Sequence, residues 1–201
     1  MNSSSLQSPL KQNFSLEKPP IILLSCGHFE KDMLKLISND ITRAFHYPVV
    51  HKECSFELSK FYNPGRRQYD GNGILKMVAD KSTPDALKTI GLFRVDFFIP
   101  ILTYIFGQAT LNGDVGIVSL FRLRNELYGL ARNNDLQIER FRKVILHELG
   151  HTFGLIHCHN PVCVMRSSTY VEDIDQKKIF FCQYCQDKLN NNLDRLLMVE
   201  E

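Results

Sequence analysis

The sequence predicts a single mixed α/β (α+β) domain, and three features support this fold class. Short apolar runs suited to buried strands alternate with segments whose apolar residues recur at helical spacing. Asn112 and Gly113 separate two strand-like segments and favour a tight antiparallel hairpin. The length of 201 residues fits one domain with a substantial core, but not two large domains.

The elements before the hairpin are expected to begin with a buried strand, where the chain reads IILLSC. Met33, Ile37 and Ile41 then lie near helical spacing, and Pro84 is expected to interrupt a later helix. In chain order, we predict a strand at residues 21–26, a helix at 29–45, a strand at 47–54, a loop at 63–73, a helix at 74–90 and a strand at 92–99.

The second half of the chain is expected to open with the hairpin, whose strands read FGQATL and DVGIVSL. A helix is predicted from Asn134 to about Phe153, with Asn134 as its N-cap and Gln137 three residues further on. A loop region with four cysteines should follow. The last predicted element is a helix at residues 183–198.

Composition and charge exclude several classes of protein. The chain is 44% hydrophobic and 23% charged, and no run approaches the roughly 20 apolar residues that span a bilayer. The net charge of +2 and the scattered arginines argue against a nucleic-acid-binding face. Residues 1–20 are polar and lack the apolar core of a secretory signal, so we expect a flexible tail on a cytoplasmic protein.

Three histidines and a glutamate stand close together in the segment HELGHTFGLIH. His147 and His151 lie one turn apart on the predicted helix, so both imidazoles can bind one zinc ion while Glu148 projects beside it. Gly154 is placed to end the helix in the left-handed conformation, and the turn lets His157 return as the third ligand. We therefore predict a zinc site made by three histidines.

Three protein ligands leave the fourth position of a tetrahedral zinc ion for water, which is the arrangement of a catalytic site. The metal lowers the pKa of bound water to about 7 and polarises a carbonyl oxygen. Glu148 is expected to take the proton of this water as general base and to pass it to the leaving amine as general acid. The motif thus predicts an enzyme that hydrolyses peptide bonds.

Four cysteines that follow the histidines form a second constellation, made of two close pairs. Four thiolates suit a tetrahedral zinc without an open position, so we predict a structural zinc there. Two disulfides or a redox-active CxxC pair are the alternatives, and the lack of an export signal favours the metal. The expected ligands are Cys158, Cys163, Cys182 and Cys185. The remaining cysteines, Cys26 and Cys54, are expected to be core thiols.

The extended histidine motif resembles that of the metzincin zinc peptidases, in which a later methionine packs beneath the metal, and Met165 stands in that place. The cysteine directly after His157 and the runs HNPVCVM and FCQYC are similar to those of the archaemetzincins, as are FGQA and GIVSLFRLR. That family carries a catalytic zinc and a second zinc on four cysteines. The resemblance implies two zinc ions in this chain.

The resemblance also implies a metzincin-like zincin fold. Such a fold has a twisted mixed sheet, a first helix behind it, an antiparallel edge strand above the cleft, the zinc helix and a last helix. Residues 106–111 would be the edge strand, which in relatives holds an extended peptide. Residues 21–201 would form one catalytic domain, in which residues 158–201 make a C-terminal subdomain around the structural zinc.

Two features depart from the family pattern. The interval between Met165 and Cys182 holds 16 residues, about one fewer than the family spacing, and a loop can absorb the difference. Some metzincins place a tyrosine two residues after the methionine to assist the oxyanion, but Ser167 stands there and the nearest tyrosine is Tyr170. The residue that stabilises the oxyanion is therefore left unassigned.

The predicted function is that of a zinc metallopeptidase, a monomer acting on peptides or unfolded protein segments. Aminopeptidase and endopeptidase activity both stay open, because an aminopeptidase needs an acidic group for the substrate amine. The acidic candidates are Asp96, Glu126, Glu172 and Asp173. The alternative is a zinc-bound module that binds a peptide or regulates a partner with little turnover. Glu148 argues against that module, which has no chemical use for a free carboxylate.

Overall fold

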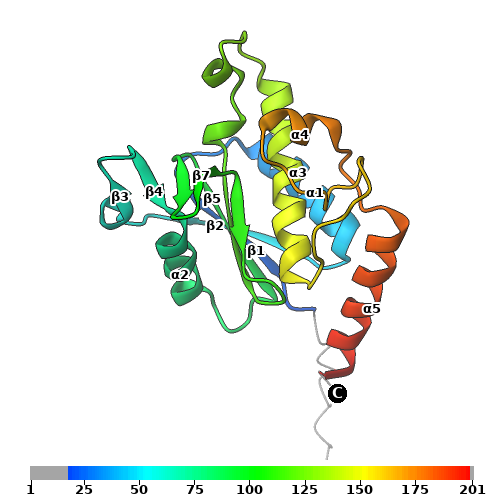
Figure 1. Ribbon diagram of the computed structural model, residues 1–201. Helices are drawn as coiled ribbons and strands as arrows, with labels where there is room; N and C mark the ends of the chain where they lie inside the picture. The colour runs from blue at the N-terminus through cyan, green and yellow to red at the C-terminus, as the bar shows by residue number, and fades with distance from the viewer. Residues whose placement is uncertain (1–17, 200–201) are drawn as a thin grey trace, which may run out of the picture.

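A five-stranded sheet forms the centre of the computed structural model, which describes residues 18–199 (Figure 1). Its strand order is β2-β1-β5-β9-β8, with β8 antiparallel at one edge and the other strands parallel. Strands β1, β5 and β9 are buried along nearly their whole length, as expected where helices cover both faces of a parallel sheet. The strands are β1 (Ile21–Cys26), β2 (Val49–Cys54), β5 (Lys88–Phe93), β8 (Gly107–Ala109) and β9 (Val115–Ser119).

Helices pack on both faces of this sheet (Figure 1). α1 (Lys31–Phe45) and α3 (Asn134–Thr152) share one core with Leu23 of β1. α2 (Gly71–Lys81) shares the other core with Ile22 of the same strand. Because successive side chains of a strand point to opposite faces, these two neighbours enter different cores.

A smaller, four-stranded sheet lies next to α2 and has the strand order β3-β4-β6-β7. Its strands are β3 (Tyr62–Asn63), β4 (Gln68–Asp70), β6 (Phe97–Ile99) and β7 (Leu102–Ile105). β7 is followed after one residue by β8, so the two sheets are joined at the edge of the larger one. The 3-10 helix η1 (Leu58–Phe61) lies beside α2 and β4, whereas η2 (Phe121–Leu123) and η3 (Asn125–Tyr128) stand between β9 and α3 in the chain.

The structure corrects three predicted elements in this region. The helix predicted at 74–90 begins at Gly71 and ends at Lys81, and its last predicted residues belong to β5. The loop predicted at 63–73 contains β4, and the strand predicted at 92–99 is divided between β5 and β6. Asp70 explains the early helix start, because its Oδ1 accepts a 3.1 Å hydrogen bond from Asn72 N. Pairing of β5 with β1 and β9 explains the strand, since non-local partners override helical spacing.

The other predicted elements are confirmed, with small shifts. β1 has the predicted bounds, and the Asn112-Gly113 turn joins the antiparallel strands β8 and β9. The N-cap of α3 is Asn133 instead of the predicted Asn134, because the Asn133 Oδ1 accepts the 3.0 Å hydrogen bond from Leu136 N. The cap thus lies one residue earlier than the pattern indicated.

The C-terminal part of the chain packs beside α3. α5 (Gln183–Val199) is the predicted last helix, and its Leu189 and Leu193 are buried in the core shared by α1 and α3. A short helix, α4 (Val171–Gln176), lies in the segment predicted to be a loop. Residues 1–17 of the predicted tail lie outside the described residues, whereas Pro20 O accepts a hydrogen bond from Leu87 N at 2.9 Å.

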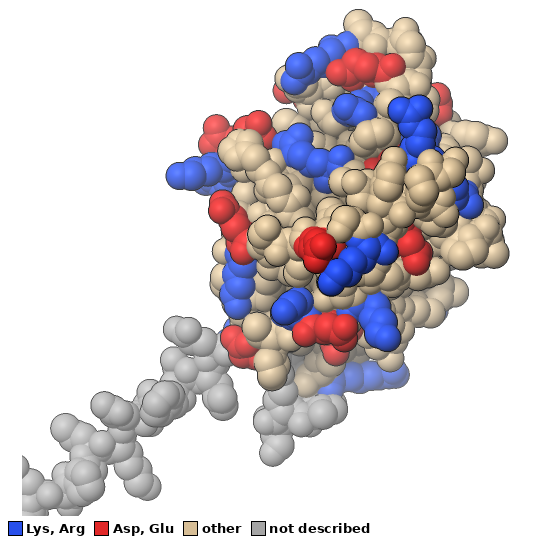
Figure 2. Space-filling model, turned by 90° about the vertical axis from the view of Figure 1, so that its left-hand side faces the viewer, with Lys and Arg blue, Asp and Glu red and all other residues tan. Residues whose placement is uncertain are grey.

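Two surface properties bear on function. Among the helices that the structure describes, none is long and apolar enough to cross a membrane. Figure 2 shows one face of the molecule, on which basic and acidic side chains are interspersed. On that face, therefore, no extended basic area is available to follow a nucleic-acid backbone.

Candidate metal centre and active-site cleft

Helix α3 brings the first two histidines of the motif together. The Nε2 atoms of His147 and His151 are 3.1 Å apart, and their ring centroids are 4.6 Å apart. Each ring is oriented through its other nitrogen: His147 Nδ1 lies 2.9 Å from Val164 O, and His151 Nδ1 lies 2.7 Å from Leu155 O. Because a carbonyl can only accept, each Nδ1 carries the proton and each Nε2 is free to bind a metal.

The third histidine joins this pair through the turn after α3. Helix α3 ends at Thr152, and Phe153 is its C-cap. Gly154 follows directly with a φ of +82°, in the left-handed region. The His157 ring centroid lies 5.3 Å from that of His147 and 5.0 Å from that of His151. The predicted role of Gly154 as the end of the helix is thereby confirmed.

The three rings fit a zinc ion. One ring nitrogen from each histidine lies within 4.8 Å of the others. Zinc–nitrogen bonds of 2.0–2.1 Å in tetrahedral geometry separate ligand nitrogens by about 3.4 Å, which is close to the 3.1 Å found for one pair. Burial lowers the pKa of His147 and of His151, which favours the neutral imidazole that a metal requires.

Glu148 is buried beside the rings and lines the same cleft. Burial raises the pKa of its carboxyl group to about 8, against the opposing effect of the positive Lys177. Strand β8 passes very close to it: a Cβ placed on Gly107 would lie 2.8 Å from both Cγ and Oε1 of Glu148. Only glycine at this position leaves room for the carboxylate.

Met165 lies beneath the helix segment that carries the histidines. It is fully buried, and a Cβ added to Gly150, between His147 and His151, would overlap its sulfur atom. The Met165 thioether thus packs directly against the helix backbone at Gly150. This agrees with the predicted place of the methionine as a packing floor.

The four clustered cysteines come together after the turn. Their sulfur atoms all lie within 4.8 Å of one another, and Cys158 Sγ is 3.7 Å from Cys182 Sγ. Zinc–sulfur bonds of 2.3 Å in a tetrahedron separate the sulfurs by about 3.8 Å, so the four thiols fit a closed zinc site. All of them are free thiols, as are Cys26 and Cys54. The last two form a half-buried pair whose sulfurs are 2.6 Å apart across β1 and β2.

A cleft of about 560 Å³ runs past the histidines. Strands β7 and β8 form one wall, and the segment after Met165 forms the other. β8 is the edge strand of the larger sheet, so its outer backbone groups face the cleft. The predicted edge strand at residues 106–111 is thus confirmed in type and place.

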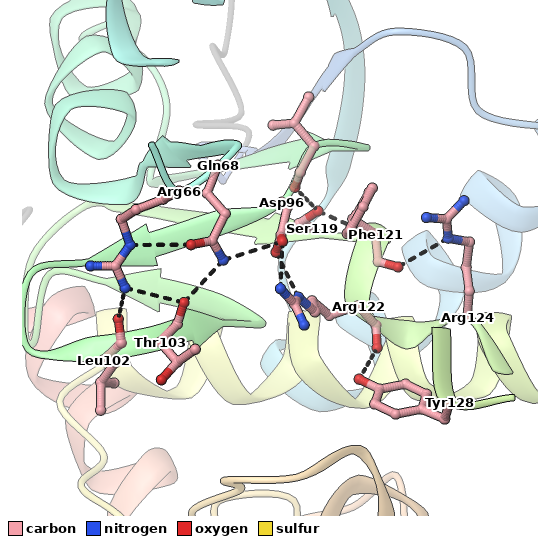
Figure 3. Close-up of polar contacts among 11 residues, drawn as sticks. Arg66, Gln68, Asp96, Leu102, Thr103, Ser119, Phe121, Arg122, Arg124 and Tyr128 are labelled. Atoms are coloured by element: carbon pink, nitrogen blue, oxygen red, sulfur yellow. Dashed lines mark hydrogen bonds and ion pairs between the residues drawn. The ribbon is translucent and has the colours of Figure 1, made fainter. Parts of the chain in front are cut away.

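A polar network holds the first wall in position (Figure 3). Arg122 donates two hydrogen bonds to the Asp96 carboxylate, at 2.8 and 2.6 Å, and Gln68 Nε2 donates to the same carboxylate at 3.2 Å. Gln68 also donates to Thr103 O of β7 at 3.0 Å. The Arg122 guanidinium stacks on the ring of Tyr104, which lines the cleft. The network therefore fixes β7 from behind.

None of the four acidic residues considered for binding a substrate amine lines the cleft. Asp96 is held in the network of Figure 3, and Asp173 Oδ2 accepts hydrogen bonds from the backbone of Thr169 and Tyr170 at the start of α4. Glu126 and Glu172 are exposed elsewhere. Among the described residues that line the cleft, Glu148 is the sole acidic one.

Two lysines in the cleft were not predicted from the sequence. Lys143 and Lys177 both line it and are both buried. Lys143 stands four residues before His147, so helical spacing could have placed it on the same face. Lys177 follows the unpredicted helix α4, and no local pattern distinguishes it from its exposed neighbour Lys178. Ser167 and Tyr170 also line the cleft.

Comparisons with known proteins agree with this site. The sequence pattern of Peptidase family M54 matches residues 52–191. The archaemetzincin of Thermococcus kodakarensis is 34% identical over 183 residues, which cover 88% of this chain and 98% of the relative. The crystal structure of archaemetzincin from Methanopyrus kandleri superposes with a TM-score of 0.79 at 27% identity, covering 90% of this chain and 98% of that one.

A second solved structure, of a zinc-dependent peptidase from Methanocorpusculum labreanum, gives a TM-score of 0.76 at 28% identity, covering 85% of this chain and 100% of that one. The matched residues of family M54 include the histidine motif and all four clustered cysteines. The resemblance and the fold class predicted from the sequence are confirmed. The chain therefore belongs to the archaemetzincin family, the zinc metallopeptidases of peptidase family M54.

Proposed function

We propose that this peptidase holds its catalytic zinc on His147, His151 and His157 and uses Glu148 as general base and then general acid. The observation that carries this proposal is a buried carboxylate beside imidazole nitrogens that face one another in one cleft. When bound, zinc lowers the pKa of a coordinated water and polarises the substrate carbonyl. Glu148 is not a ligand, so its carboxylate is free to accept a proton.

Within this mechanism the chain has two tasks. The unpaired edge of β8 offers backbone groups to an extended peptide, which aligns the substrate along the cleft. Glu148 then takes the proton of the attacking water and delivers it to the nitrogen of the leaving amine. Burial raises the pKa of Glu148, whereas the positive charge of a bound zinc ion would lower it and so favour the ionised form that accepts the proton.

We propose a second, structural zinc on Cys158, Cys163, Cys182 and Cys185, and thus two zinc ions per chain. Four free thiols at tetrahedral spacing support it. Residues 21–201 then form one catalytic domain, in which 158–201 make a subdomain around this ion. Free thiols are typical of a reducing compartment, which supports a cytoplasmic location.

We propose internal peptide bonds as the substrate, rather than N-terminal ones. An aminopeptidase needs an acidic group for the free amine of its substrate, and Glu148, the sole acidic residue among the described cleft residues, has a catalytic task. An extended peptide that pairs with β8 needs no free terminus.

The test replaces Glu148 by Gln and measures cleavage of a fluorescence-quenched peptide library by the zinc-loaded protein. We expect turnover to fall about 10²- to 10⁴-fold, with both zinc ions retained, because a general base is lost and no ligand is removed. Glu126→Gln, at an exposed site, is the matched control and should cleave normally. Equal turnover by Glu148→Gln would disprove the mechanism, and absence of turnover in the wild type would favour a peptide-binding module.

A further inference from the structure

Lys177 is a buried cation that forms no ion pair with any described residue, although the charges of Glu148 and Asp173 act on it from a longer distance. Its side chain is 5% exposed, it lines the cleft, and its Nζ donates one long hydrogen bond, 3.4 Å, to Val164 O. Among the described residues, no carboxylate lies within 4.0 Å of this ammonium. Burying a charge is costly unless it is paired and hydrogen-bonded, so a protein keeps such a group where a ligand completes it.

The ammonium is close to the metal ligands. Val164 O, which accepts its hydrogen bond, also accepts the hydrogen bond of His147 Nδ1 at 2.9 Å. One carbonyl oxygen therefore separates the lysine from the imidazole that faces the metal. Burial lowers the pKa of Lys177 to about 8, and a group with this value is still mainly charged at pH 7.

Lys143, the other lysine of the cleft, has a carboxylate partner within ion-pair distance. Its Nζ lies 2.6 Å from Glu139 Oε1 and donates to Ile174 O at 3.3 Å. Lys177 has no such carboxylate. Of the two acids that influence Lys177, Asp173 caps α4, and Glu148 forms no ion pair with it.

A second observation points to a polar ligand on the same wall. Ser168 Oγ lines the cleft, is buried, and has no hydrogen-bond partner among the described residues. The ammonium has three N–H donors and makes one long hydrogen bond, and the serine hydroxyl makes none, so this wall offers donor groups that a ligand can still use. A carboxylate is the acceptor that satisfies a cation most strongly.

We propose that Lys177 binds a carboxylate of the peptide substrate, either an Asp or Glu side chain or a C-terminal carboxylate, next to the cleaved bond. The inference rests on the proposed function and names its substrate class. A substrate carboxylate supplies the partner that Lys177 lacks, and Ser168 is placed on the same wall to donate a further hydrogen bond.

The experiment uses zinc-loaded, full-length protein and fluorescence-quenched peptides that are acetylated and amidated, so that one Glu is their sole carboxylate. This Glu is moved through the positions that flank the cleaved bond, and each peptide has an isosteric Gln partner. A third set carries Gln and a free C-terminus at the corresponding distances. The sets distinguish a side-chain carboxylate from a terminal one. The proteins are the wild type, Lys177→Met, Lys177→Gln and the matched control Lys178→Met, whose side chain is exposed.

We expect the wild type to cleave the best carboxylate peptide about 10- to 100-fold more efficiently than its neutral partner, as hydrogen bonds to charged groups permit. Both Lys177 variants should bring this kcat/KM ratio close to one, while Lys178→Met keeps it. A ratio near one in the wild type, or an unchanged ratio in a folded Lys177 variant, would overturn the inference. An equal loss of kcat/KM on both peptides would also overturn the inference, because it would indicate that Lys177 takes part in the reaction itself.

A binding measurement separates this inference from the proposed function. Calorimetry on zinc-loaded Glu148→Gln protein, which does not cleave, should give a Kd for the carboxylate peptide about tenfold or more below that of its neutral partner. If no peptide is cleaved by any protein but this preference in Kd is found, the proposed function fails and the carboxylate site stands. Equal Kd values would overturn the site even where cleavage is found.

Discussion

At the scale of single residues, Lys177 links stability to pH. Burial lowers its pKa from an ordinary 10.5 to about 8, so between these values the folded protein binds fewer protons than the unfolded chain. The contribution of this lysine to the free energy of unfolding therefore increases as the pH rises from about 8 to 10.5. Below about pH 8 the lysine is charged, so the full cost of burying that charge lowers the stability of the fold.

We predict that the difference in the free energy of unfolding between wild type and Lys177→Met changes by roughly 3 kcal/mol across this window. The wild type gains relative to the variant as the pH rises, because methionine does not titrate. Denaturant unfolding at fixed zinc concentration, from pH 7 to 10.5, measures it. Lys178→Met, at the exposed neighbouring position, should follow the wild type. A constant difference for Lys177→Met would show that the lysine titrates normally in the fold.

At the scale of elements, the site depends on how closely β8 approaches α3. The two elements are in contact along the cleft, and a Cβ on Gly107 would lie 2.8 Å from the Glu148 side chain and 2.9 Å from Ile117 O of β9. The backbone oxygen cannot move without opening the β8–β9 pair, so the carboxylate must move instead. The strand proposed to hold the substrate thus also positions Glu148, the proposed general base.

We predict that Gly107→Ala lowers kcat/KM about 10- to 100-fold with zinc content unchanged, because misplacement of a reacting group by about 1 Å has an effect of this order. Peptide cleavage and elemental analysis of the same preparation measure both quantities. Gly65→Ala is the control, since a Cβ there meets a single side-chain atom at an ordinary 3.4 Å. Full activity in Gly107→Ala would mean that strand and carboxylate are not in tight apposition.

At the scale of the whole molecule, the histidine and cysteine clusters could be predicted because their geometry is local. The period of a helix sets the approach of His147 and His151, and Gly154 is required by the left-handed turn before His157. The cysteine cluster was also predictable, because two close pairs of cysteines are a spacing typical of zinc sites.

The parts that could not be predicted depend on distant partners. The two residues of β3 are a strand only through pairing with β4, and β5 is a strand through pairing with β1 and β9. Helix α4 is held by Asp173 at its start, and its six residues are too few for the apolar spacing of Val171 and Ile174 to identify a helix from the sequence. Lys177 enters the cleft because α4 ends there, so its place follows from packing and not from spacing.

The two proposed metal centres adjoin in the chain, since His157 of the histidine cluster is followed at once by Cys158 of the cysteine cluster. Zinc on the cysteines would connect the turn after α3 to the start of α5, and structural zinc contributes about 10 kcal/mol or more of binding free energy to folding. Loss of this ion should therefore loosen both α5 and the third histidine. Loss of the catalytic ion should leave α5 in place, because its ligands lie mainly on α3.

Elemental analysis of purified protein tests this organisation. We predict two zinc ions per chain in the wild type and one in His147→Ala, with little change in Tm. Cys182→Ser should hold at most one and should have a clearly lower Tm, because removal of one thiolate opens the closed site that joins two segments. Cys54→Ser lies outside both clusters and should keep two zinc ions. One ion or none in the wild type would contradict two separate sites. An unchanged Tm in Cys182→Ser would show that zinc on the cysteines does not stabilise the packing of α5.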